Sequence, residues 1–146
     1  RDRANRGAGG VARSHLAFQG AWCKPLSGVS DPFIAELLAF REGVIFAQLR
    51  GYSHVIMEVD CLHLVDLWNS RGNSRSIASP IFRELLDIVP HFISFSVRHV
   101  GRDLNVTAHL CAEHACTLDG TDSWLAVSPD FLRTSLRADC NQLLLF

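Results

Sequence analysis

The pattern of apolar and polar residues predicts alternating helices and strands along the chain. A helix should begin at Asp31-Pro32, because Asp caps helix N-termini and Pro is tolerated in the first turn, and it should end near Gly51. Apolar residues lie on most faces of this segment, which is typical of a helix buried against several neighbours. A strand is predicted at 54–59, with Val55, Met57 and Val59 on one face, and another at 91–100, where the two faces alternate strongly.

The other segments carry weaker signals of the same kinds. Residues 1–10 are rich in Gly and Arg and are predicted to form a turn or leader. The remaining predicted elements are hairpin strands at 11–18 and 19–24 and helices at 61–69, 80–89 and 105–116. Strands that alternate with helices indicate an α/β domain in which crossover helices join parallel strands. We expect this domain at residues 1–117, with a tail at 118–146 that packs on the domain or trails from it.

The composition narrows the class of protein. The chain has 146 residues, of which 48% are hydrophobic and 20% charged, as in a globular domain. No uncharged stretch approaches the roughly 20 apolar residues of a membrane span, and no secretory signal opens the chain. The formal net charge of -1 gives no support for non-specific binding of nucleic acid by the surface as a whole. Such binding would need a local basic patch. Five scattered cysteines indicate a reducing compartment rather than a disulfide framework.

Two carboxylates stand in unusual positions. Glu36 lies in the mostly apolar helix with no Lys or Arg one turn away, so it is solvated at an edge, paired with another element, or a metal ligand. Asp60 follows a hydrophobic strand and precedes a helix. It is either the N-cap of that helix or a metal-binding carboxylate at the carboxyl end of the strand.

Two histidines are further candidates. His99 ends the last predicted strand, where it is either a general acid or base or a polar surface residue. His109 lies one helical turn after Asn105, on the same face of the predicted helix. It is either a structural or surface histidine, or a fourth member of a site with Glu36 and Asp60.

Four segments, taken in order, carry a family resemblance: GAGGVAR at 7–13, AELLAFREG at 35–43, Val59-Asp60, and HVGRDLN at 99–105 followed by AHLCA at 108–112. Together they resemble the ribonuclease H type 1 family. More narrowly, the chain resembles the plant ribonuclease H-like domains related to non-LTR retrotransposons. In the family they correspond to the second strand, the first helix, a strand with a catalytic Asp, and the closing loop and helix. The resemblance covers residues 7–116.

The resemblance implies a mixed sheet flanked by helices and a metal-dependent endonuclease that cleaves the RNA strand of RNA–DNA hybrids. The implied cofactor is Mg²⁺, with Mn²⁺ as an alternative, held by carboxylates. Glu36 and Asp60 match two of the family's four carboxylates, and His99 matches its loop histidine. His109 stands where the last Asp is expected, which is a departure. The strand with the first Asp precedes 7–13 in the family, and we expect it to be missing or truncated here.

These departures leave two functional hypotheses. The first is a ribonuclease H-like nucleic-acid-binding domain, ancestrally a hybrid endonuclease, in which the loss of two carboxylates impairs cleavage. The alternative is a catalytically inactive nucleic-acid- or protein-interaction module, or a retroelement-derived relic. Candidate contacts with a nucleic-acid backbone, each of which is otherwise a solvated surface residue, are Arg71, Asn73, Arg75, Arg98 and Arg102. The family and the reduced cysteines predict an intracellular protein, nuclear or cytoplasmic, without a membrane partner.

Overall fold

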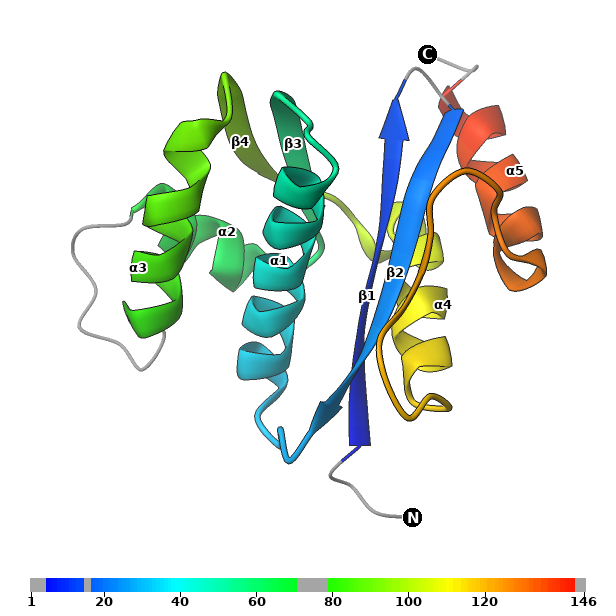
Figure 1. Cartoon of the computed structure of the whole chain (residues 1–146), viewed down its shortest axis with the longest axis horizontal. Coiled ribbons are helices and arrows are strands. Elements are labelled where there is room, and N and C mark those ends of the chain that lie inside the picture. The colour runs from blue at the N-terminus through cyan, green and yellow to red at the C-terminus, as the bar shows by residue number, and fades with distance from the viewer. Residues whose placement is uncertain (1–4, 15–16, 71–78, 144–146) are drawn as a thin grey trace. The chain divides into compact units, whose positions relative to one another are not determined.

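The structure divides into two compact units. It is a computed structural model that describes residues 5–14, 17–70 and 79–143 (Figure 1). Unit 2 is continuous and spans Asp31–Arg102. Unit 1 is formed by the described residues that precede unit 2 together with those that follow it. Unit 2 is therefore an insertion between the two segments of unit 1.

Unit 2 begins with the long helix α1 (Pro32–Leu49). Its N-cap is Asp31, whose carboxylate accepts hydrogen bonds from the amides of Phe33 (2.8 Å) and Ile34 (3.4 Å). Gly51 follows the helix with a φ of 73°, a left-handed conformation that glycine adopts without a steric penalty. Both predicted ends of this helix are confirmed.

We expect the Asp31→Ala variant to lose about 0.5–2 kcal/mol of unfolding free energy, because two amides in the first turn of α1 lose their acceptor. Urea denaturation followed by circular dichroism measures this loss. Asp31→Asn is the matched control, since asparagine caps about as well as aspartate. Equal stability of the alanine and asparagine variants would contradict the capping role.

The rest of unit 2 is a parallel strand pair with two further helices. These elements are β3 (His54–Val59), α2 (Leu62–Asn69), α3 (Ser79–Ile88) and β4 (Ser94–His99). The register of β3 and β4 runs from His54 opposite Ser94 to Val59 opposite His99. The strand predicted at 91–100 begins later than expected. The 3-10 turn Val89–His91 prolongs the preceding helix, and the amide of Phe92 donates to the carbonyl of Val89 (3.1 Å).

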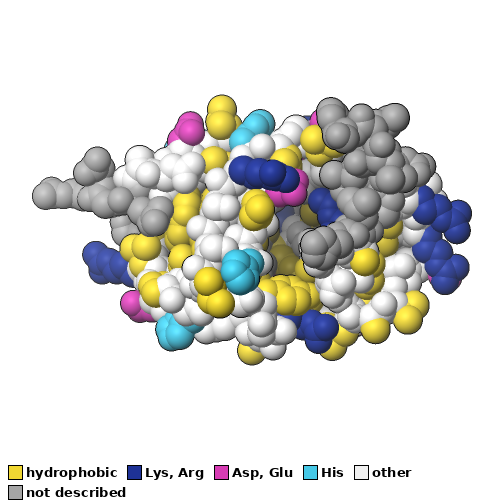
Figure 2. Space-filling model, turned by 90° about the horizontal axis from the view of Figure 1, so that it is seen from above, with side chains coloured by type: hydrophobic (Ala, Val, Ile, Leu, Met, Phe, Trp, Pro, Cys, Tyr) yellow, Lys and Arg dark blue, Asp and Glu magenta, His cyan; other side chains and the backbone are white. Residues whose placement is uncertain are grey.

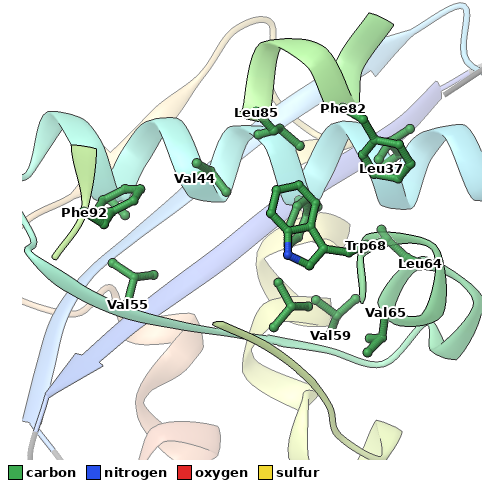
Figure 3. Close-up of a cluster of buried hydrophobic side chains, with 13 residues drawn as sticks. Leu37, Val44, Val55, Val59, Leu64, Val65, Trp68, Phe82, Leu85 and Phe92 are labelled. Atoms are coloured by element: carbon green, nitrogen blue, oxygen red, sulfur yellow. The ribbon is translucent and has the colours of Figure 1, made fainter. Parts of the chain in front are cut away.

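The core of unit 2 gathers around Trp68 (Figure 3). The indole is 2% exposed, and its centroid lies 5.5 Å from the ring of Phe40, 6.1 Å from that of Phe82 and 5.7 Å from that of Phe95. These rings come from α1, α3 and β4, so one side chain of α2 joins most of the elements of the unit. The core therefore holds α1 against the strand pair that carries Asp60.

Unit 1 is built on an antiparallel sheet with the strand order β1-β2-β5. Its strands and α-helices are β1 (Asn5–Ser14), β2 (Ala17–Ser27), α4 (Val106–Ala115), β5 (Asp122–Trp124) and α5 (Arg133–Leu143). Two 3-10 turns, Arg102–Leu104 and Asp130–Leu132, precede α4 and α5, and the first of them begins with the last residue of unit 2. Parallel and antiparallel pairing together with helices confirms the predicted α/β class. Among the described residues, β1 and β3 belong to separate sheets, and each has one unpaired edge.

The glycine-rich start of the chain forms a strand, so the predicted turn or leader is wrong for residues 5–10. The cause is the close approach of α4. A β-carbon on Gly7 would overlap the carbonyl of Ala112, and one on Gly9 would overlap Cys111. Glycine in a strand often marks such a contact with another backbone. The resemblance, which matches residues 7–13 to a strand of the family, agrees with β1, whereas the local propensity does not.

The tail packs on unit 1. Strand β5 pairs with β2, and Leu132 is fully buried. The ring of Phe131 stacks on His114 of α4 with centroids 4.2 Å apart, and the ring of Trp124 lies 5.5 Å from Phe131. The helix predicted at 105–116 is thus followed by a second one, α5. The described helices include none that is both long and apolar enough to cross a membrane.

Candidate functional site

Asp60 lies directly after β3, at the junction with α2. The N-cap of α2 is Cys61, whose carbonyl accepts from the amides of Leu64 (3.1 Å) and Val65 (3.2 Å). Asp60 therefore precedes the cap instead of occupying it, and the capping interpretation of this residue is wrong. Its side chain is half-buried. The position leaves Asp60 at the carboxyl end of a parallel strand, where open α/β sheets bind their ligands.

His99 lies at the same edge of the strand pair. It is the register partner of Val59, the residue before Asp60, and the amide of Val100 donates to the carbonyl of Val59 (3.0 Å). His99 is exposed. The parallel pairing therefore brings two of the four candidate residues to one sheet edge, although they are 39 positions apart in the chain.

Glu36 lies on α1, in the same unit. It follows Phe33 by three residues and so shares its helix face. The ring of Phe33 lies 4.6 Å from that of His63, in the first turn of α2 and three residues after Asp60. This contact brings the first half of α1 to the β3–α2 junction. Glu36 is half-buried, and its neighbour Leu37 is in the core.

His109 belongs to unit 1. It lies on α4 and is half-buried, and its amide donates to the carbonyl of Asn105 (3.1 Å). Asn105 is the N-cap of α4, as the sequence predicts. The one-turn spacing of these two residues is therefore confirmed, whereas a role for His109 beside Glu36 and Asp60 stays a prediction.

The donors present fit a family metal site only in part. Glu36 and Asp60 offer the carboxylate oxygens that Mg²⁺ prefers, while His99 offers a softer nitrogen. Within residues 5–14, 17–70 and 79–143, no three His, Cys, Asp or Glu side chains are grouped so that they could hold a metal ion. The described residues thus do not fit the resident metal cluster that the resemblance implies.

The basic candidates divide into paired, exposed and undescribed residues. Arg98 donates to Glu58 across the strand pair at 2.9 Å, a salt bridge that follows from their opposite positions in the register. Arg102 is exposed at the start of the turn before α4. Arg71, Asn73 and Arg75 lie outside the described residues. Figure 2 shows basic side chains interspersed with acidic and histidine side chains.

Two features of the site escape sequence reasoning. Glu58 is not among the candidate residues, but it is half-buried and paired with Arg98. The sequence holds a signal for this pairing, since each residue comes one position before the end of its strand. The signal can be used only when the register of the two strands is known. The ring contact between Phe33 and His63 has no such signal, because it depends on how two helices meet.

Two solved structures share the fold. One is the N-terminal RNase H domain of a Mycobacterium tuberculosis protein, with a TM-score of 0.57 and 13% identity over 76% of this chain and 91% of that one. The other is RNase H1 from the halophilic archaeon Halobacterium salinarum, with a TM-score of 0.54 and 15% identity over 77% of this chain and 97% of that one. The chain therefore has a ribonuclease H-like fold, which confirms the fold predicted from the resemblance.

The family can also be stated. The model described as reverse transcriptase-like matches residues 1–115, and the chain belongs to this family. No curated protein matches the chain. The plant and retrotransposon origin predicted from the sequence stays a prediction.

Proposed function

We propose that the chain is a nucleic-acid-binding domain whose partner is an RNA–DNA hybrid. The observation that carries this proposal is the meeting of Asp60 and His99 at the carboxyl edge of β3 and β4, in a chain with a ribonuclease H-like fold. This edge is where an α/β sheet offers side chains to a ligand. Family membership supports the same class of partner.

Such a domain would recognise the shape of the hybrid rather than its sequence. Contacts would reach the 2′-hydroxyls and the phosphate backbone. The proposed phosphate contacts among the described residues are Arg98 and Arg102, which lie on either side of His99 and Val100. With a net charge of -1 and few such contacts, binding should be modest and should weaken as salt rises.

The residues available as metal ligands favour the alternative, a module that binds nucleic acid without cleaving it. Hydrolysis in the family relies on divalent cations that activate water and stabilise the leaving oxygen. Here Glu36 and Asp60 are the two matching carboxylates, and His109 replaces a third with an imidazole, a poorer ligand for Mg²⁺. We therefore propose that hybrid binding persists while cleavage is weak or absent. We further propose an intracellular location, nuclear or cytoplasmic.

The test measures binding and cleavage of one labelled RNA–DNA hybrid in parallel. Fluorescence anisotropy gives the Kd at two salt concentrations, with duplex DNA as competitor. Gel electrophoresis follows cleavage in Mg²⁺ and then in Mn²⁺. We expect binding that duplex DNA does not abolish, and little or no cleavage. Any residual cleavage should disappear in Asp60→Asn, because that change removes one of the two carboxylates that match the family.

The variants separate the hypotheses. Glu36→Gln is a near-isosteric control on α1. Strong cleavage by the original chain that is lost in Glu36→Gln would show a working metal site and overturn the inactive alternative. Cleavage unchanged in Asp60→Asn would overturn the site assignment. Failure of the folded chain to bind the hybrid would overturn the proposed function itself.

A further inference from the structure

Two cysteines meet in the core of unit 1. Cys23 on β2 and Cys111 on α4 are both fully buried and belong to the same apolar cluster. The Cys23 thiol is also the largest cause of the raised pKa of the Cys111 thiol. Gly9 is the register partner of Cys23, and the space where its β-carbon would stand is filled by the β-carbon of Cys111. The absence of that β-carbon lets α4 bring Cys111 next to Cys23.

The two cysteines belong to different chain segments of unit 1. Unit 1 consists of two segments separated by the whole of unit 2. Cys23 belongs to the first segment and Cys111 to the second. Apart from the continuous chain through unit 2, only non-covalent packing holds the described parts of these segments together. A bond between the two sulfurs would join them directly.

We propose that Cys23 and Cys111 are an oxidisable pair, which a low-molecular-weight disulfide converts into an intramolecular disulfide that fastens α4 to β2. One cysteine sulfur, as the thiolate, attacks the oxidant, forms a mixed disulfide and releases one small thiol. The second cysteine sulfur, after losing its proton, then attacks the mixed disulfide and releases the second small thiol. The pair loses two protons and two electrons, and the oxidant is reduced to two thiols.

The fold also sets the rate of this step. The neighbouring thiol of Cys23, and then burial, raise the pKa of Cys111 well above its usual value, so its thiol stays protonated at neutral pH. Oxidation therefore requires an opening motion that exposes the pair. It should be much slower than modification of the exposed Cys116. Once formed, the cross-link closes a long loop and should stabilise unit 1 by constraining the unfolded chain.

The experiment uses the full chain with oxidised glutathione as the probe. In one arm, the other cysteines (Cys61, Cys116 and Cys140) are replaced by serine, so that only the pair can react. After incubation, the chain is unfolded, remaining thiols are alkylated, and the mass is measured. We expect the loss of two hydrogen atoms, no alkylation and no glutathione adduct. We also expect a Tm higher by about 5–10 °C that reductant reverses.

A second arm protects the test against misfolding of that variant. The unsubstituted chain is oxidised in the same way and digested, and a disulfide-linked peptide pair containing Cys23 and Cys111 is sought. The matched control Cys23→Ser leaves Cys111 without a resolving thiol and should give no cross-link and no rise in Tm. Persistent alkylation of both thiols, a stable glutathione adduct on either, or a lower Tm after oxidation would overturn the proposal.

Discussion

Replacing Trp68 by alanine should lower the free energy of unfolding by about 3–5 kcal/mol, as expected for a large buried aromatic residue. The indole is almost fully buried and lies among the rings of Phe40, Phe82 and Phe95. Truncation leaves a cavity at the point where α1, α2, α3 and β4 meet, and it removes three ring contacts as well. Chemical denaturation followed by circular dichroism and hydrogen exchange should show the loss in unit 2.

The matched control lies on the same helix. Leu62 is 55% exposed, so Leu62→Ala should change the unfolding free energy by no more than about 1 kcal/mol. Trp68→Phe should fall between the two, because it keeps an aromatic ring but not the full volume. If Trp68→Ala and Leu62→Ala cost the same, the core of unit 2 is not built around Trp68.

The elements that the sequence predicts well are those with local signals. The helix from Asp31 to Gly51 has a capping side chain at one end and a glycine with positive φ at the other, and both act within a few residues. Strand β3 places Val55, Met57 and Val59 on one face, and Val55 and Val59 are buried. The order of the first eight elements follows from such signals and agrees with the structure.

The errors have long-range causes. Gly7 and Gly9 look like turn residues by propensity, but they lie in a strand because α4, about a hundred residues later, packs on their backbone. The late start of β4 has a more local cause, since the turn Val89–His91 continues the helix past Pro90. A single residue's preference cannot report a contact with a distant element.

In the candidate site, too, the features with local signals could be predicted and those that depend on distant contacts could not. The edge that joins Asp60 and His99 follows from two parallel strands, and the periodicity predicts both strands. The closeness of α1 to this edge rests on the ring contact between Phe33 and His63, which no pattern in either segment encodes. Glu36 could therefore be predicted as a candidate residue from its unusual environment and from the family resemblance. The residues that lie near it in space could not be predicted.

The close packing of α4 on β1 gives the second large effect. We expect Gly9→Ala to lower the free energy of unfolding by about 3 kcal/mol, the upper part of the usual range for overpacking. The added β-carbon would lie about 2.5 Å from the backbone nitrogen of Ala112, so rotation of a side chain cannot relieve the clash. Gly120→Ala is the matched control, because a β-carbon there meets no heavy atom of the described residues within 4 Å.

The Gly9→Ala variant also tests the proposed disulfide between Cys23 and Cys111. If α4 is pushed away from β1, Cys111 moves away from Cys23, and the cross-linked form should become less favourable relative to the two free thiols. Hydrogen exchange of the α4 amides should rise in Gly9→Ala and stay unchanged in Gly120→Ala. Equal denaturation midpoints and equal exchange in the two variants would mean that α4 does not lie against β1 at Gly9. The strand assignment of the glycine-rich segment would then lose its physical cause.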